Sequence, residues 1–336
     1  MRTLSLVTGA NGHLGNTLVR ELLARGHQVR AGVRDPCRST ALNVLGCQVV
    51  RAELQDQASL RLSLEGVDVL YQVAAVFKHW AKNPYAEIVE VNVQGTRNVM
   101  RAAAEAGVKR VVYVSSVAAV GHNGEHLNET HWNTDLQNPY YLSKILSERA
   151  AWEASEAHGL SMVAVLPSAI IGPHTSRLTD TMGFLAAVLE RKLVLDPNFH
   201  FNFVDVRDVA DGLIRAAEKG RCGQRYLLAN QQPSSVAEVI AALNTVCPGY
   251  RMPPRAPKAL LLLIAWLQEQ RARYTDIPAQ LLRSQVQMFY GVHQRYCIDK
   301  AVNELGYQPR SPQDALTQAF AHLLARSYSV REQIAG

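Results

Sequence analysis

The chain has 336 residues, of which 48% are hydrophobic and 19% are charged, the composition of an ordinary globular protein with room for one large or two modest domains. Its net charge is +6, but no run of five or six basic residues occurs, which argues against a nucleic-acid-binding arm. The five cysteines form no CxxC pair, so we expect neither a disulfide framework nor a metal site, and a reducing compartment fits.

The apolar stretches indicate a cytoplasmic protein with no membrane span. The first one is short and runs directly into glycines, unlike a secretory signal. The longest one, residues 259–267 (ALLLLIAWL), falls well short of the roughly 20 residues that cross a bilayer. We interpret it as a core helix in preference to a contact with a membrane surface.

Strand-like and helix-like segments alternate through the first half of the chain. Strands are predicted at 4–7, 28–33, 67–73, 110–114 and 161–166, and helices at 13–25, 85–106 and 139–158. Strands separated by helices of this length indicate right-handed βαβ units and a parallel sheet, and nearly continuous apolar strands suit a sheet covered on both faces. The predicted fold is α/β, with a Rossmann-type doubly wound sheet.

The second half has a different rhythm. After about Ser168 prolines become denser, and helices are predicted at 208–219, 235–246, 277–290 and 312–325. We expect a smaller, mainly helical lobe. The predicted dinucleotide-binding domain covers residues 1–167, with 203–222 returning to it, and the predicted substrate-binding lobe covers 168–202 and 223–330.

The stretch TGANGHLG places Gly9, Gly12 and Gly15 between the first strand and the first helix. A dinucleotide fingerprint requires this order of strand, glycine turn and helix. Glycines allow a close approach to the backbone, and the helix N-terminus carries the partial positive charge that suits a pyrophosphate. The spacing is GxxGxxG, and a purely structural turn is the alternative.

The second strand ends in Arg34, and Arg38 follows closely. A basic group at this position suits the 2′-phosphate of NADP, whereas a carboxylate suits the ribose hydroxyl of NAD. Asp35 is adjacent, so a solvated Arg–Asp pair is the alternative. We favour NADP(H) as the cofactor and keep NAD(H) as possible.

Tyr140 and Lys144 are four residues apart on the predicted helix 139–158 and therefore share one face. A free tyrosine has a pKa of about 10, and a nearby ammonium lowers it by stabilising the phenolate. The pair suits proton transfer to or from a carbonyl or alcohol oxygen. Ser115 and Ser116 end the strand 110–114, where a hydroxyl could hold the reacting oxygen, and Tyr141 is expected to serve packing.

Together, TGANGHLG, the serine after strand 110–114, YYLSK and LPSAIIGP resemble the extended short-chain dehydrogenase/reductase family, within the NAD-dependent epimerase/dehydratase superfamily. The segments VRDP and NVQGT (92–96) look most like its dihydroflavonol 4-reductase-like branch. FVDVRDVAD (203–211) and DKAVNELGYQPR (299–310) match later family motifs. The resemblance covers roughly residues 3 to 325.

The resemblance implies specific roles. Tyr140 would be the proton donor in reduction, Lys144 would bind the nicotinamide ribose and tune Tyr140, and Ser116 would be the catalytic serine. The remaining implied cofactor contacts are the glycine loop with Asn11, His13 and Leu14, Arg34 at the 2′-phosphate, Glu53 and Leu54 beside the adenine, Val73, Ala74 and Ala75 along the cofactor, and Pro167 and Ser168 against the nicotinamide. Glu53 stands where the family usually has Asp, which is a departure.

Substrate contacts are predicted at Phe77, Lys78, Trp80, Gly121 and His174. Phe77 and Trp80 could wall an apolar pocket, and Lys78 could meet a polar group. Plant flavonoid reductases of this branch carry a polar substrate-binding residue near Gly121. Because glycine cannot make that contact, an aldehyde or ketone other than a flavonoid fits better.

The first functional hypothesis is therefore an NADPH-dependent reductase of an aldehyde or ketone, acting on a small molecule as a monomer or homodimer. The alternatives are a nucleotide-sugar epimerase or dehydratase and a 3β-hydroxysteroid dehydrogenase-like enzyme. Arg34 argues against the epimerase because that group generally favours NAD. A cofactor-sensing protein without turnover is a further alternative, although such relatives typically lose the Tyr–Lys pair.

Overall fold

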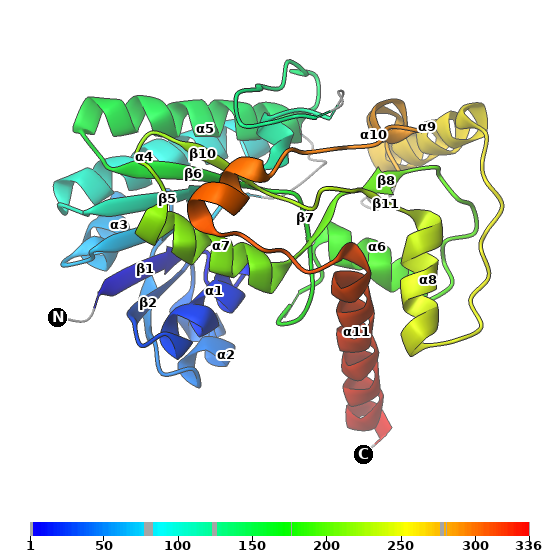
Figure 1. Ribbon diagram of the computed structural model, residues 1–336, viewed down its shortest axis with the longest axis horizontal. Helices are drawn as coiled ribbons and strands as arrows, with labels where there is room; N and C mark the ends of the chain where they lie inside the picture. Colours follow the sequence, from blue (N-terminus) through cyan, green and yellow to red (C-terminus); the bar gives the residue numbers. More distant parts are fainter. Residues whose placement is uncertain are drawn as a thin grey trace.

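The computed structural model describes residues 3–76, 83–122, 126–175, 177–275, 279 and 281–335. Figure 1 shows a larger α/β part, built around one sheet, and a smaller, mainly helical part that includes the C-terminal helix. The predicted fold class, a Rossmann-type doubly wound sheet with a smaller helical lobe, is confirmed.

Seven parallel strands form the central sheet in the order β3-β2-β1-β4-β5-β6-β10. Their bounds are β1 Leu4–Thr8, β2 Gln28–Val33, β3 Gln48–Arg51, β4 Val69–Gln72, β5 Arg110–Val114, β6 Met162–Pro167 and β10 Arg225–Leu228. β1 pairs with β2 on one side and β4 on the other, so the strand order reverses there. In such sheets a ligand binds outside the carboxyl ends of the strands at this point.

Helices cover both faces of the sheet. α1 (His13–Ala24) and α7 (Val206–Lys219) pack together on one face, and α3 (Gln57–Leu64), α4 (Val91–Glu105) and α5 (Pro139–His158) cover the other (Figure 1). A π-helical turn, Tyr85–Glu90, leads into α4, and the short α2 spans Thr40–Asn43. Each face carries its own core of buried apolar side chains, so the sheet is covered on both faces as predicted.

In the part of the chain that the structure describes, the second lobe combines two small sheets with five α-helices. β7 (Ala169–Ile171) pairs with β9 (Phe203–Asp205), and β8 (His200–Phe201) pairs with β11 (Ser234–Ser235). The helices are α6 Asp180–Leu189, α8 Val236–Val246, α9 Lys258–Tyr274, α10 Arg283–Phe289 and α11 Pro312–Ala335. The central sheet also includes β10, which pairs with β6. β10 begins just after segment 203–222, which the sequence predicts to return to the dinucleotide-binding domain.

The apolar run in α9 is only half buried. Leu261 and Ala265 lie in the core of the lobe, whereas Leu263 and Trp266 are exposed to solvent. The interpretation of residues 259–267 as a core helix therefore holds for one face of the helix only. Within the described residues, no helix combines the length and the apolarity needed to cross a bilayer.

Candidate active site

The glycine turn after β1 is a point of close packing. Gly9 has φ +67°, and a Cβ there would lie 2.9 Å from the Cα of Ala74. A Cβ on Gly15 would lie 2.3 Å from the Gly9 carbonyl oxygen. Larger residues at these positions would push β1, α1 and the end of β4 apart, so the glycines are needed for the turn itself.

The N-terminus of α1 is open at the carboxyl edge of the sheet. Its N-cap, Gly12, offers no side chain, and no acidic residue occupies the first turn. By contrast, Asn138, Asp205 and Ser235 cap α5, α7 and α8 with their side chains. An uncapped helix start with its partial positive charge is what a pyrophosphate requires, so this end of α1 fits a dinucleotide.

Neighbouring residues tie the glycine loop to other segments. Asn11 Nδ2 donates a hydrogen bond to Ser39 Oγ over 2.6 Å, which links the loop to the segment after β2. His13 Nε2 lies 2.7 Å from the carbonyl oxygen of Pro173, and burial lowers the pKa of His13. Leu14 is buried in the core, so its backbone alone is available to a ligand.

Arg34 and Glu53 form an ion pair at the ends of β2 and β3, with 2.8 Å between Arg34 Nε and Glu53 Oε2. The Arg34 side chain remains 80% exposed, so most of its guanidinium is accessible to a ligand. Arg38 pairs with Asp35 over 3.3 Å and is equally exposed. The carbonyl oxygen of Leu54, beside Glu53, accepts a hydrogen bond from Asn98 Nδ2 on α4 over 2.9 Å.

Thr8 fixes the backbone that follows β4. Its hydroxyl donates to Gln72 Oε1 over 2.8 Å and accepts hydrogen bonds from the N–H groups of Val73 and Ala74 over 3.0 and 3.1 Å. Gln72 Nε2 in turn donates to the carbonyl oxygen of Ala74. These contacts hold residues 73–75 beside the glycine turn, where the sequence predicts the path of the cofactor.

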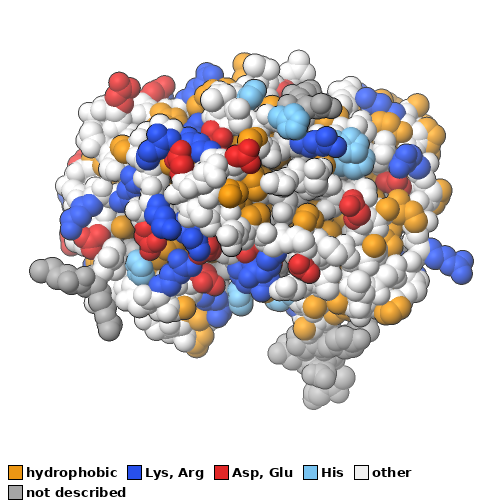
Figure 2. Space-filling model, viewed as in Figure 1, with side chains coloured by type: hydrophobic (Ala, Val, Ile, Leu, Met, Phe, Trp, Pro, Cys, Tyr) orange, Lys and Arg blue, Asp and Glu red, His pale blue; other side chains and the backbone are white. Residues whose placement is uncertain are grey.

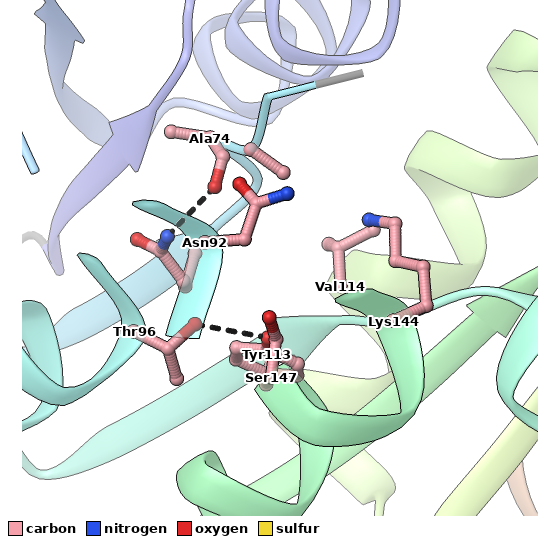
Figure 3. A pocket seen from close by; sticks show the side chains of 9 residues that line it. Ala74, Asn92, Thr96, Tyr113, Val114, Lys144 and Ser147 are labelled. Carbon is pink, nitrogen blue, oxygen red and sulfur yellow. Dashed lines mark hydrogen bonds between the residues drawn. The ribbon is translucent and has the colours of Figure 1, made fainter. Parts of the chain in front are cut away.

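A pocket opens between the ends of β4 and β5 and the helices α4 and α5 (Figure 3). Its lining consists of Gln72, Ala74, Ala75, Asn92, Thr96, Tyr113, Val114, Lys144 and Ser147. Figure 3 shows the Lys144 side chain reaching from α5 into this pocket, on the side opposite Ala74. Asn92 is held by hydrogen bonds with the N–H and carbonyl groups of Val76 and with Ser143 Oγ. The pocket thus joins three of the predicted cofactor contacts: Ala74, Ala75 and Lys144.

Tyr140 lies in the first turn of α5, where the side chain of Asn138 accepts a hydrogen bond from its backbone N–H. The ring is buried, and a side-chain hydrogen bond joins it to Ser116 at the end of β5. Burial raises the pKa of Tyr140 to about 12, and the hydrogen bond with Ser116 opposes the rise. The phenol is therefore protonated at neutral pH and can act as an acid.

Lys144 follows one helical turn later. Burial lowers the pKa of its ammonium to about 8, and the Glu148 carboxylate opposes this by raising it. The group is therefore largely charged at pH 7. It can stabilise negative charge that develops on a neighbouring oxygen.

Behind these residues lies a buried ion pair. Glu148, fully buried on α5, accepts a hydrogen bond from Ser115 Oγ over 2.5 Å and from Arg225 Nε over 2.7 Å. Arg225 begins β10, and it also donates to the carbonyl oxygens of Glu129 and His131 over 2.7 Å each. The pair therefore joins α5, the end of β5, β10 and the loop before α5.

The two serines after β5 thus face different partners: Ser115 contacts Glu148 and Ser116 contacts Tyr140. At the end of β6, the Ser168 hydroxyl is buried and has no hydrogen-bond partner among the described residues. A bound ligand with a polar group at this edge would satisfy it. Pro167, the last residue of β6, is adjacent.

The model of the NAD-dependent epimerase/dehydratase family matches residues 5–229 of this chain, which include the glycine turn, the Tyr–Lys pair and all seven strands of the sheet. The chain belongs to this family. It is an enzyme of the NAD(P)-dependent oxidoreductase class. Use of a nicotinamide cofactor follows from the family, and the glycine turn and the pocket at the carboxyl edge of the sheet are suited to binding one.

Three relatives illustrate the range within the family. A Synechocystis protein whose name provisionally assigns it as a dihydroflavonol 4-reductase is 35% identical over 94% of this chain and 92% of its own length. Sterol demethylase protein B of Methylococcus capsulatus is 36% identical over 77% of this chain and 80% of its own. Cinnamoyl-CoA reductase CAD2 of Medicago truncatula is 32% identical over 74% of this chain and 82% of its own.

The predicted substrate residues of this family member are scattered. Phe77, Lys78 and Trp80 lie outside the described residues. Gly121 has φ +137°, and its carbonyl oxygen accepts a hydrogen bond from the Tyr296 hydroxyl over 3.0 Å. His174 has φ +67°. Burial lowers its pKa, and the positive charge of Arg20 on α1 lowers it further. The carbonyl oxygen of the preceding Pro173 meets His13 at the start of α1, so His174 lies near that end of the helix.

Sequence reasoning missed several residues that shape the site, among them Thr8, Asn92, Glu148 and Arg225. Two of them had a signal in the sequence. Asn92 lies in the NVQGT segment that carries the resemblance, and Glu148 continues the four-residue spacing from Tyr140 to Lys144 along the same helix face.

Proposed function

We propose that this enzyme is an NADPH-dependent reductase that converts an aldehyde or ketone into an alcohol, with Tyr140 as the proton donor. The observation that carries the proposal is the arrangement of three groups at the end of β5. The Tyr140 phenol shares a hydrogen bond with Ser116, and Lys144 lies one turn further along α5 in the adjoining pocket. This is a proton-donating acid with a hydrogen-bonding partner and a nearby cation.

In this mechanism Ser116 and Tyr140 hold the carbonyl oxygen of the substrate with their hydroxyl groups. A nicotinamide cofactor, when bound, would supply the hydride for the carbonyl carbon. As negative charge develops on the oxygen, Tyr140 transfers its proton to it. Lys144 then stabilises the phenolate that remains, because its ammonium is charged near neutral pH.

The protonation state of Tyr140 favours reduction over oxidation. Its pKa of about 12 means that the phenol holds its proton across the neutral range, as a proton donor must. Oxidation of an alcohol would instead require the phenolate as a base. Tyr140 therefore carries at pH 7 the proton that reduction of a carbonyl requires.

The cofactor is proposed to follow the carboxyl edge of the sheet. The glycine turn and the open start of α1, with the backbone at Asn11, His13 and Leu14, would hold its pyrophosphate. Residues 73–75, Lys144 and the end of β6 at Pro167 and Ser168 would hold its nicotinamide half. Arg34 is proposed to bind the 2′-phosphate with the exposed part of its guanidinium, with Arg38 nearby and with Glu53 and Leu54 beside the adenine.

The relatives support reduction of a carbonyl compound. Two of the three are named as reductases, one for dihydroflavonols and one for cinnamoyl-CoA. Gly121 lacks a side chain for polar substrate contact, and its φ of +137° disfavours any other residue. We therefore propose a ketone or aldehyde other than a flavonoid as the substrate.

The test is the oxidation of NADPH and NADH in the presence of a panel of aromatic and aliphatic aldehydes, ketones and β-keto esters. Tyr140→Phe should lower kcat/KM by about 10²–10⁴-fold without changing the fold, because it removes only the transferable proton. Tyr141→Phe is the matched control, since it removes a neighbouring buried hydroxyl on the same helix turn. Equal losses in both variants would contradict the role of Tyr140.

A second candidate follows from the Methylococcus relative, whose name refers to sterol demethylation. It favours a 3β-hydroxysteroid dehydrogenase-like oxidation of a bulky alcohol by the same Tyr–Lys pair. The test is the reduction of NAD⁺ or NADP⁺ in the presence of sterol alcohols. Turnover of these alcohols at neutral pH, with none of the carbonyl panel reduced, would replace the first proposal with the second.

A further inference from the structure

The α9 helix presents an apolar strip to solvent. The exposed side chains are Leu260, Leu263, Trp266 and Leu267, and their exposed fractions run from 40% to 54%. At roughly 100° per residue these positions share one face of the helix, opposite the buried Leu261 and Ala265. An exposed cluster of large apolar side chains marks an interaction surface.

Basic residues border this strip. Arg271 and Arg273 are exposed near the end of α9, and by helical geometry they fall on its two sides. Lys258, at the start of the helix, falls on the opposite face, with its Nζ 5.9 Å from the centroid of the Tyr290 ring. The one acidic residue of α9, Glu269, is 18% exposed and is paired with Arg283 over 2.7 Å. Figure 2 shows hydrophobic and Lys or Arg side chains together over the region of α9 and α10.

The charge of the chain is concentrated here. Residues 251–275 contain five Lys and Arg residues and one Glu, which gives a net charge of +4 out of +6 for the whole chain. A helix with Leu and Trp on one face and basic residues beside it is the pattern of a helix that lies in a membrane interface. Its 17 residues lie along the surface of the folded lobe, so this is a contact with a membrane and not a crossing of it.

We propose that the outer face of α9 docks on an anionic lipid bilayer. Leu263, Trp266 and their neighbours would enter the headgroup region, while the flanking arginines contact lipid phosphates. A second copy of this chain fits less well, because a symmetric pairing would bring two strips with the same positive charge together. The inference is independent of the reaction that the enzyme catalyses.

Vesicle flotation with the purified full chain tests the proposal. The protein should float with vesicles of equal parts phosphatidylglycerol and phosphatidylcholine at low salt, and much less with phosphatidylcholine alone or at high salt. Two double variants separate the contributions: Leu263→Gln with Trp266→Gln removes the apolar contact, and Arg271→Gln with Arg273→Gln removes charge. Each should lower vesicle binding by roughly tenfold or more.

The matched control is Leu62→Gln with Arg61→Gln on α3, where an exposed leucine and arginine lie on the other part of the molecule. It should bind vesicles like the unchanged protein, and circular dichroism should show all three variants folded. No vesicle binding by the folded protein, or equal loss in the control, would overturn the proposal. Self-association that only the Leu263/Trp266 variant abolishes, without vesicle binding, would assign the face to a second copy instead.

Discussion

Two ion pairs hold parts of the larger α/β part of the molecule together, and they differ mainly in their access to water. Glu148 and Arg225 join α5 to β10, with side chains that are 0% and 8% exposed. Arg34 and Glu53 join the ends of β2 and β3, and Arg34 is 80% exposed. Their atoms approach within almost the same distance, 2.7 and 2.8 Å. Distance alone therefore says little about what an ion pair does.

The surroundings explain the difference. Inside the protein a charge is costly unless other groups satisfy it, and Glu148 accepts additional hydrogen bonds from Ser115 and Trp152. Arg225 also stacks on the Trp132 ring, 4.1 Å from its centroid. The exposed pair has water as its alternative partner, so its guanidinium can turn to a ligand at little cost. The buried pair is suited to fixing structure, and the exposed pair is suited to binding.

The largest effect should come from breaking the buried pair. Arg225→Met leaves the Glu148 carboxylate buried without its partner, and the free energy of unfolding should fall by about 3–5 kcal/mol. Urea unfolding measures this. Arg34→Met is the control and should cost less than about 1 kcal/mol, because its pair is exposed. Similar small losses in both variants would show that burial does not separate the two pairs.

The exposed pair should matter for cofactor choice. If Arg34 binds the 2′-phosphate, Arg34→Ala should raise the KM for NADPH by roughly 10- to 100-fold, since it removes a charge-assisted hydrogen bond worth about 1.5–3 kcal/mol. The KM for NADH should change far less. Steady-state kinetics with both cofactors measures the ratio, and Arg61→Ala, an exposed arginine on α3 outside the proposed cofactor path, serves as the control. An equal rise for both cofactors would remove Arg34 from this role.

Short sequence patterns predicted those parts of the site whose geometry depends only on residues close together in the chain. The glycine turn and the Tyr140–Lys144 pair were visible because strand–turn–helix order and the four-residue helical spacing act within a few residues. Arg225 could not be found in this way. It lies 77 residues after Glu148 and meets it only because β10 pairs with β6 at the edge of the sheet.

Strand β3 and the exposed face of α9 were not predicted from the sequence for similar reasons. β3 has half-exposed side chains at the edge of the sheet, so its sequence QVVR lacks the apolar run of the other strands. In α9 the run ALLLLIAWL is apolar all round, and no pattern within it distinguishes the face that packs from the face that meets solvent. The packing of α10 against α9 determines which face of α9 is buried.

A change at Glu148 should also reach the reaction through Lys144. The Glu148 carboxylate raises the pKa of Lys144 against the effect of burial, so Glu148→Gln should lower that pKa below its value of about 8. Because the proposed mechanism needs the ammonium, the fall in kcat/KM on the alkaline side should begin at lower pH in the variant. A pH–rate profile measures the shift. Glu53→Gln, which removes a distant carboxylate, should leave the pH at which this fall begins unchanged.

The smallest predicted effect concerns that distant carboxylate. Glu53 holds Arg34 through Nε, and Glu53→Gln should weaken this contact while leaving the guanidinium in place. Removing the negative charge near the proposed phosphate site should lower the KM for NADPH by a few-fold at most, because the pair is exposed and screened by solvent. The unfolding free energy should change by less than about 1 kcal/mol. A higher KM for NADPH would mean that Glu53 positions Arg34. The exposed pair would then fix the position of a side chain, as the buried pair does.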